Sequence, residues 1–326
     1  MKKTHYYGID YLRAIACIGI LMMHVQANIG LKSLHGFVFE SLIPSFTNFV
    51  FLFMAVSAFG MCIGYFDKVS AKEVDWTDFY KKRYLKILPF FAILVIIDLV
   101  MSHAKAAFIE GFTDVTLLFG LFPNNISVIG VGWFLGVVFA FYLIFPFFCF
   151  LIHNRLMAWI SFAVSLVLNY FCVSYYNVGR TNIVYCLPFF IAGGLVFLYK
   201  DLLTKIKWYV FLPFTAVSVV VYFWAGGNVY TCLFTSICLL IQALLIPFGN
   251  KSAVSKLFIF ISGISMEIYL SHMLVYRALE KIHLNSFFKN DLLQYFAFVL
   301  MVFAGAVIFS FIMQKILKRI LNKFGV

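Results

Sequence analysis

Two ionisable side chains in the first apolar stretch of the chain have a spacing that could support chemistry. Arg13 and His24 are eleven residues apart. On an α-helix this spacing turns by about 1100°, which leaves both side chains on one face and about 16 Å apart along the axis. A guanidinium could hold an anion there, and an imidazole could remove a proton or carry a covalent intermediate. We therefore predict that His24 is catalytic and that Arg13 binds a ligand.

Three later ionisable residues are expected at membrane depth, where such groups are functional candidates. Asp98 and His272 each lie fourteen residues into an apolar stretch, about 21 Å from its start, and Glu267 lies nearer the middle. Ser265 and His272 share a helical face with Tyr269 close to it, so Ser265 and Tyr269 are candidate substrate contacts, whereas Glu267 is about 140° away from His272. Glu267 and His272 should therefore not point into one cavity, and His272 is the stronger of these two catalytic candidates.

A run of basic residues, KKRYLKILP at 81–89, adds a possible anion site. Arg83 and Lys86 are neighbours on a helix because they are three residues apart. Such a cluster suits a polyanion such as a nucleotide phosphate. Trp133, near the outer end of another apolar stretch, is a candidate substrate contact, although an aromatic-belt position is its default interpretation.

Each candidate also has a plain structural interpretation. Arg13 could pair with Asp10 or extend to the membrane interface, and His24 could bond to a neighbouring helix. Asp98 and Glu267 could form a polar pair inside the bundle. The basic run could be a signal of membrane orientation alone.

The elements that must position these residues follow from composition. Hydrophobic residues make up 64% of the 326 residues and charged residues 12%, whereas soluble domains carry about 25% charged residues. We therefore predict an all-α, polytopic transmembrane bundle in a single domain, 1–326. At about 20 residues per span, ten apolar stretches fit: 9–28, 43–66, 84–103, 130–152, 156–175, 182–199, 208–225, 228–247, 258–277 and 292–314. A further stretch, 115–122, is too short to span and is expected to be re-entrant or interfacial.

The charge distribution predicts an orientation. The net charge is +12. With the N-terminus inside, 18 Lys and Arg residues fall in cytoplasmic segments and six in outer loops, so both termini are expected in the cytoplasm. In a soluble protein the same excess of basic residues would suggest nucleic-acid binding. In a membrane protein we interpret it as the orientation signal instead, and we expect no nucleic-acid partner. The seven cysteines form no metal-binding spacing, so we expect no metal.

Taken together, several motifs resemble the membrane-bound acyltransferase type 3 family, whose members are ten-helix bacterial proteins. The resemblance covers essentially the whole chain and departs at Ser57-Ala58, where the family often has Ser-Gly. Its motifs are IDYLRAIACIGILMMH (9–24), FLFMAVSAF (51–59), KKRYLKILP (81–89), GWFLGVVFAFYLIFP (132–146), LPFFIAGGLVF (187–197) and ISMEIYLSHMLVY (264–276).

The resemblance implies an O-acyltransferase of the bacterial inner membrane, similar to compact members that acetylate surface polysaccharides. Acyl-CoA, with acetyl-CoA as the expected donor, would bind on the cytoplasmic side, and the acceptor would be a hydroxyl of an extracytoplasmic or lipid-linked carbohydrate. Arg13, Arg83 and Lys86 would hold the coenzyme A phosphates. His24 would act as general base or carry the acyl group, two roles that the sequence leaves open.

Two other functions compete with this interpretation. A transporter or flippase for a lipid-linked saccharide would also need many helices and polar groups at mid-depth. It would not require Arg13 and His24 on one stripe, and the sequence lacks paired Gly/Pro-broken helices in matching halves. A purely structural membrane subunit would leave the intramembrane charges unexplained.

Overall fold

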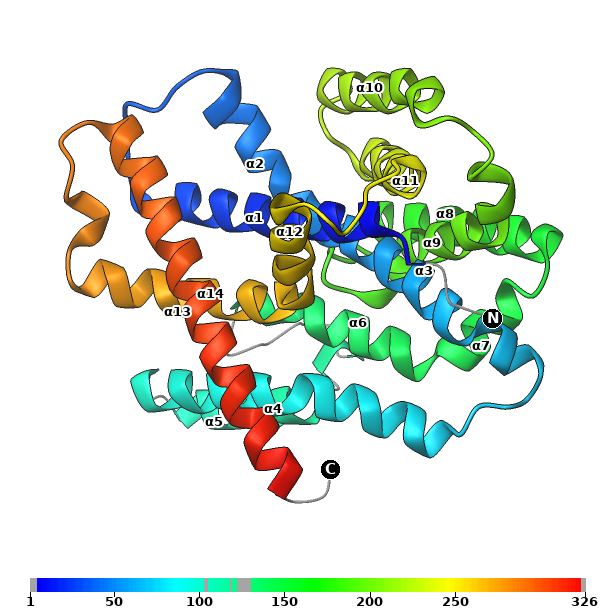
Figure 1. Ribbon diagram of the computed structural model, residues 1–326, viewed down its shortest axis with the longest axis horizontal. Coiled ribbons are helices and arrows are strands. Elements are labelled where there is room, and N and C mark those ends of the chain that lie inside the picture. Colours follow the sequence, from blue (N-terminus) through cyan, green and yellow to red (C-terminus); the bar gives the residue numbers. More distant parts are fainter. Residues whose placement is uncertain (1–4, 103–104, 118, 122–129, 324–326) are drawn as a thin grey trace.

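The computed structural model describes residues 5–102, 105–117, 119–121 and 130–323, and these residues form helices and connecting segments with no strand (Figure 1). The α-helices are α1 (Tyr7–Ile29), α2 (Ile43–Ser45), α3 (Phe49–Ser70), α4 (Trp76–Ser102), α5 (Lys105–Thr116), α6 (Trp133–Leu143), α7 (Phe145–Leu151), α8 (Arg155–Ser174), α9 (Ile183–Leu203), α10 (Trp208–Trp224), α11 (Val229–Leu245), α12 (Ala253–Gly263), α13 (Ser265–Lys281) and α14 (Asp291–Lys323). Shorter helical turns cover Val38–Leu42, Phe46–Asn48, Phe119–Leu121, Gly130–Gly132 and Leu284–Ser286.

The predicted all-α bundle is confirmed, and each of the ten apolar stretches coincides with a helix or a bent helix pair over its described residues. Within the described chain, five continuous helical segments are long and apolar enough to cross a membrane, and the number rises to seven if each bent pair is one span. The apolar helices α10 and α11 are shorter than this limit. Ten spans therefore stay a prediction.

Several helices begin at side chains that cap them. Asn154 accepts a hydrogen bond from the Met157 amide at the start of α8, and Asn228 accepts from two amides at the start of α11. Such caps satisfy amides that have no partner within the helix. At its far end α1 stops at Gly30, whose φ of 72° is the left-handed conformation that favours glycine.

Two predicted spans are bent rather than straight. The axis turns by 67° between α6 and α7, and by 73° between α12 and α13. The second bend lies at Ile264, between Gly263 and Ser265. Irregular backbone at membrane depth is tolerated where it is buried in protein or lines a cavity, and Gly263 and Ser265 do line a cavity.

Glycines allow two helix pairs to pack backbone against backbone. A Cβ atom added at Gly193 of α9 would collide with the carbonyl oxygen of Ala55 in α3. One added at Gly8 of α1 would collide with the carbonyl oxygen of Ala243 in α11. These contacts fix α1 and α3 against α11 and α9, which lie beside them in the bundle (Figure 1).

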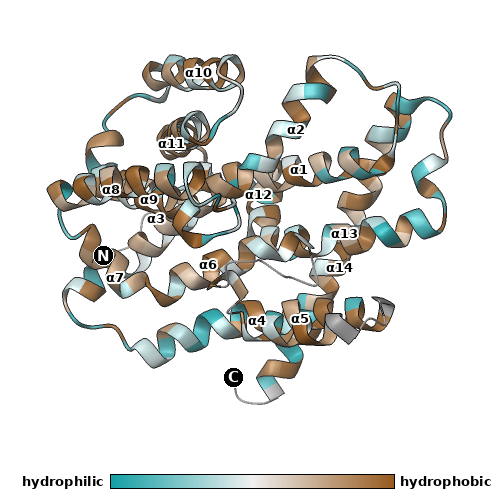
Figure 2. Ribbon diagram, turned by 180° about the vertical axis from the view of Figure 1, so that it is seen from behind, coloured by the Kyte–Doolittle hydropathy of each residue, from teal (hydrophilic) through white to brown (hydrophobic). Residues whose placement is uncertain are grey.

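The outer surface carries the apolar faces expected of a membrane protein. Large side chains are exposed along α8 and α10, among them Trp159, Val164, Phe214 and Trp224. Hydrophobic residues predominate along these helices in Figure 2 as well. Exposed apolar faces of this kind are favourable in contact with lipid and unfavourable in contact with water. The chain is therefore a multi-pass membrane protein.

The short stretch predicted at 115–122 lies partly outside the described residues. Its described part ends α5 and forms the turn Phe119–Leu121, in which Phe119 and Gly120 are buried. A Cβ atom at Gly120 would collide with the backbone of Gly136 in α6. This part of the stretch is therefore packed against the bundle.

Candidate active site

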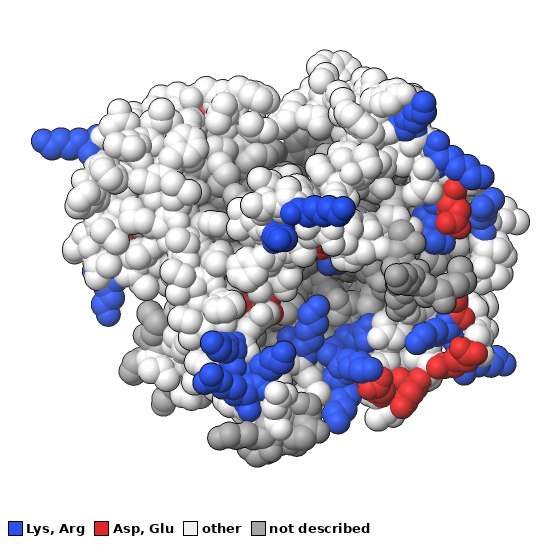
Figure 3. All heavy atoms as spheres, in the orientation of Figure 1, with Lys and Arg blue, Asp and Glu red and all other residues white. Residues whose placement is uncertain are grey.

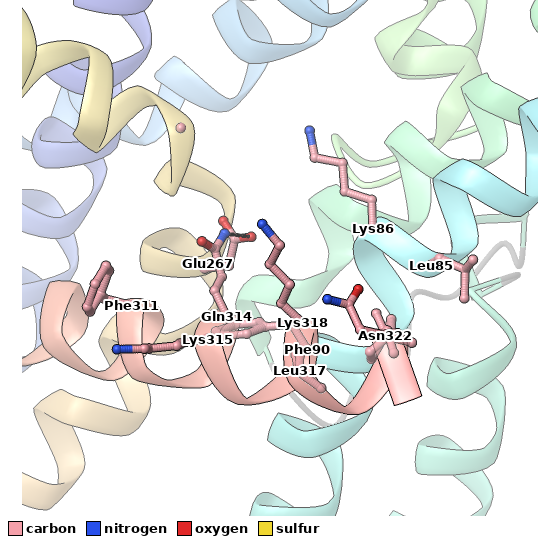
Figure 4. Close-up of a pocket in the computed structure, with 13 residues that line it drawn as sticks. Leu85, Lys86, Phe90, Glu267, Phe311, Gln314, Lys315, Leu317, Lys318 and Asn322 are labelled. Carbon is pink, nitrogen blue, oxygen red and sulfur yellow. Dashed lines mark hydrogen bonds between the residues drawn. The ribbon is translucent and has the colours of Figure 1, made fainter. Parts of the chain in front are cut away.

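A cavity of about 700 Å³, here called the wide cavity, lies between α4, α13 and α14 (Figure 4). Its polar lining consists of Lys86, Glu267, Gln314, Lys315, Lys318 and Asn322. Figure 3 shows Lys and Arg side chains gathered over this part of the surface, where α4 begins and α14 ends. We call this end of the bundle the basic end.

A narrow cavity of about 120 Å³ continues from the wide one, since Lys86, Gly263 and Glu267 line both. Arg13 lines it from α1, and Ser57 does so from α3. Further lining residues, Tyr142, Ser265 and Tyr269, come from α6 and α13. The predicted ligand residue Arg13 and the predicted substrate residues Ser265 and Tyr269 therefore meet in one space.

A third cavity, the histidine cavity, has a volume of about 270 Å³ and lies further along α1 and α13. Its polar lining consists of His24, Asn28, Asp98, Trp133 and Arg277. Arg13 and His24 thus both face the interior from one helix, as their spacing predicted, and they reach different cavities.

His24 and His272 lie side by side at the histidine cavity. Their ring centroids are 5.0 Å apart. His272 is fully buried, and its Nδ1 atom lies 2.6 Å from the Tyr269 carbonyl oxygen. Because a carbonyl can only accept, Nδ1 donates and Nε2 of the neutral ring is left as an acceptor. That Nε2 atom has no hydrogen-bond partner among the described residues.

Tyr269 separates the narrow cavity from the histidine cavity. Its side chain lines the narrow cavity, and its hydroxyl donates a 2.7 Å hydrogen bond to the carbonyl oxygen of Val131, which lines the histidine cavity. The Phe134 ring packs edge-on against it. Tyr269 therefore lies between the two cavities with its side chain and accepts the His272 hydrogen bond with its backbone carbonyl.

Glu267 and His272 do not share a cavity, as their helical angle predicted, because Glu267 lines the wide and narrow cavities and His272 lines none of the three. Glu267 is buried and accepts a 2.6 Å hydrogen bond from Nε2 of Gln314 (Figure 4). His272 instead packs against His24. Ser265 donates to the carbonyl of Ser262, so its hydroxyl caps the bend between α12 and α13.

The three predicted anion-binding cations are not all brought together. Arg13 and Lys86 line the narrow cavity, whereas Arg83 lines none of the three. The Arg83 guanidinium stacks on the rings of Tyr65 and Phe79, at 4.4 and 4.0 Å, and donates to the Tyr65 hydroxyl. Its role as a phosphate ligand stays a prediction.

The pairing of Arg13 with Asp10, considered from the sequence, is not observed in the described structure. The Asp10 carboxylate instead accepts hydrogen bonds from His5, at 2.6 Å, and from Ser262, at 2.8 Å. Within the same residues no salt bridge involves Arg13. The Arg13 guanidinium is thus left available to a ligand in the narrow cavity.

Two arginines that the sequence analysis counted only as loop charges lie at the histidine cavity, Arg277 in its lining and Arg180 against the lining residue Trp133. Arg277 pairs with Asp98 at 3.0 Å. Arg180 lies over the ring of Trp133, 5.5 Å from its centroid, and donates to the Thr47 carbonyl. Asp98 is therefore paired with a basic residue, and not with Glu267 as the alternative interpretation held.

Other lining residues were missed for different reasons. Tyr142 sits in an aromatic run without a distinguishing pattern. Lys315 and Lys318 were counted only as orientation charges, although their spacing of three residues on one helix is the signal that marked Arg83 and Lys86. Within the described residues, no three His, Cys, Asp or Glu side chains are grouped as metal ligands would be.

Comparison with known proteins gives one match. Residues 6–313 match the family model described as an acyltransferase domain, of type 3. No curated protein and no solved structure matches the chain. Because the matched region covers most of the chain, with α1 to α13, most of α14 and every residue that lines the narrow and histidine cavities, the chain belongs to the acyltransferase type 3 family and is a membrane acyltransferase.

Proposed function

We propose that the protein transfers an acetyl group from acetyl-CoA, bound at the basic end, to a hydroxyl of a carbohydrate at the histidine cavity. The observation that carries this proposal is the series of cavities along α1 and α13, from lysines through Arg13 to His24, whose ring packs against His272. A donor with an anionic end and a reactive acyl end needs this order of groups. The acceptor is an extracytoplasmic or lipid-linked saccharide.

The narrow cavity suits the unbranched pantetheine arm of the donor. Its volume of about 120 Å³ excludes a nucleotide but admits a chain. Arg13 would hold an anionic or carbonyl oxygen of the donor there. The thioester would then reach Tyr269, beyond which His24 lies about 16 Å along α1 from Arg13.

In a direct transfer, the acceptor oxygen attacks the thioester carbonyl carbon while the His24 imidazole takes the hydroxyl proton. The carbon–sulfur bond then breaks, and the thiolate leaves with that proton as the CoA thiol. In the covalent alternative, His24 attacks the thioester carbon first, and the carbon–sulfur bond breaks with release of the thiolate. The acceptor oxygen then displaces the imidazole from the acyl group, and the hydroxyl proton passes by way of the freed imidazole to the thiolate. Both routes give an ester and free CoA.

His272 would orient His24 in either route. Its proton is held on Nδ1 by the Tyr269 carbonyl, so Nε2 can accept from a ring N–H of His24. A neighbour that fixes the tautomer of a catalytic histidine is a common device in acyl transfer. Asn28 and Trp133, together with the Asp98–Arg277 pair, line the space for the acceptor.

The proposed location is the bacterial inner membrane, with both termini in the cytoplasm. This orientation is supported by the basic bias of the sequence and places the basic end beside cytoplasmic acetyl-CoA. The histidine cavity would then open on the outer side, where the acceptor is found.

The test is transfer of radiolabel by the purified full-length protein. It is incubated with acetyl-CoA labelled in the acetyl group and with the glycolipid and polysaccharide fraction of the bacterial membrane. We expect label in the carbohydrate, released by mild alkali as an ester would be. Acetyl-CoA labelled in the adenine ring is the matched control and should leave the carbohydrate unlabelled. Absence of alkali-labile label from the carbohydrate would contradict the proposal.

A further inference from the structure

The wide cavity has a wall that the family match does not include. The match ends at residue 313, and α14 continues to Lys323. Four polar residues of this extension, Gln314, Lys315, Lys318 and Asn322, line the cavity. Lys315 and Lys318 are neighbours on the helix because they are three residues apart.

The cations of this wall have no acidic partner within the described residues. No salt bridge there involves Lys86, Lys315 or Lys318. The buried carboxylate of Glu267 is the acidic group of the lining, and Gln314 donates a hydrogen bond to it. In Figure 4, Lys318 from α14 and Lys86 from α4 extend into the same opening.

The sizes of the two joined cavities match the two ends of a nucleotide thioester. The wide cavity, at about 700 Å³, is in the range of ligand pockets. The narrow cavity holds only a chain. Arg83, by contrast, is stacked between Tyr65 and Phe79 and does not line the wide cavity.

From the cavity, its cations and the position of α14, we propose that the last turns of α14, residues 314–322, form the phosphate-binding wall for the nucleotide end of the donor. Lys318 extends toward Lys86 across the opening, Lys315 lines the same wall one turn earlier on α14, and the three lysines share the phosphate charge. This inference rests on the proposed function and assigns its donor site to a segment outside the matched domain. Lysine ammonium groups bind phosphate as point charges and tolerate several phosphate positions.

The experiment measures binding of radiolabelled CoA to the detergent-solubilised full chain by equilibrium dialysis, with pantetheine as the ligand that lacks every phosphate. Lys315→Gln and Lys318→Gln should each weaken CoA binding about tenfold, and the double variant more. Binding of pantetheine should stay unchanged. Arg319→Gln is the matched control, since Arg319 lies on the same turn of α14, carries the same charge and does not line the cavity.

Equal CoA affinity of the double variant and the unmodified protein would overturn the inference while leaving the proposed function intact. An equal loss in Arg319→Gln would overturn it too, because the effect would then be one of net charge. If the unmodified protein bound no CoA, the donor part of the proposed function would fail as well.

Anionic phospholipid headgroups carry the same phosphate chemistry, so vesicles provide a second arm. In reconstituted protein, the two lysine variants should bind CoA about tenfold more weakly in neutral phosphatidylcholine vesicles as well as in vesicles that contain phosphatidylglycerol. A defect restricted to phosphatidylglycerol vesicles would assign the wall to lipid and overturn the inference.

Discussion

The wide cavity and the surroundings of His24 differ in how their polar side chains are held. At the basic end, Lys86, Lys315 and Lys318 are exposed cations without a bonded partner in the described structure. At the other end, His272 and Tyr269 are buried and tied to backbone carbonyls. Flexible lysine side chains are sufficient to bind a polyanion. A chemical step instead requires catalytic side chains whose geometry is fixed by neighbouring groups.

The largest effect is expected when His24 is replaced. His24→Gln keeps hydrogen-bonding capacity but cannot take up a proton, so the transfer rate should fall by about 10²–10⁴-fold. Binding of CoA should stay unchanged, because His24 does not line the wide or the narrow cavity. Label transfer and equilibrium dialysis measure the two quantities.

The matched control is His153→Gln, which alters an exposed histidine that lines none of the three cavities. It should transfer acetyl at the rate of the unmodified protein. A near-normal rate for His24→Gln would show that His24 only ties helices together.

A smaller effect is expected where the two regions meet. Tyr269→Phe removes the hydrogen bond to the Val131 carbonyl. Such a bond contributes about 0.5–1.5 kcal/mol to the free energy of unfolding. We expect transfer to fall by up to about tenfold while CoA binding is retained. Without acceptor, release of CoA from acetyl-CoA by water should rise, and thiol titration measures it.

Tyr295→Phe is a close control for this substitution, because Tyr295 is also buried and its hydroxyl also donates to a backbone carbonyl, that of Met22. It should lose comparable stability without any rise in CoA release. Equal CoA release in both variants would show that Tyr269 does not separate the cavities.

The smallest effect is expected at the mouth of the histidine cavity. Asp98→Asn breaks the pair with Arg277, whose side chain is 55% exposed. Exposed ion pairs contribute about 0.2–1 kcal/mol to the free energy of unfolding. We therefore expect a small fall in the thermal unfolding temperature measured in detergent. A loss of transfer as large as that of His24→Gln would instead place Asp98 among the catalytic residues, as the sequence predicted.

The helices and the separation of Glu267 from His272 could be predicted, because both follow from helical periodicity within one segment. The position of Arg83 could not, since it depends on Tyr65 and Phe79 stacking against its guanidinium. The bend at Ile264 was also missed, because no proline marks it. Contacts between distant helices, such as Tyr269 with Val131, leave no local pattern.

The glycine contacts at Gly193 and Gly8 have a mechanical consequence. They bring α3 to α9 and α1 to α11 so close that a Cβ atom at either glycine would meet the backbone of the facing helix. These helices form a rigid frame, and packed interiors transmit strain rather than absorb it. Any change in cavity shape during turnover must then come from α4, α13 and α14. Amide hydrogen exchange should accordingly be faster in the membrane-embedded turns of these three helices than in α3 and α9.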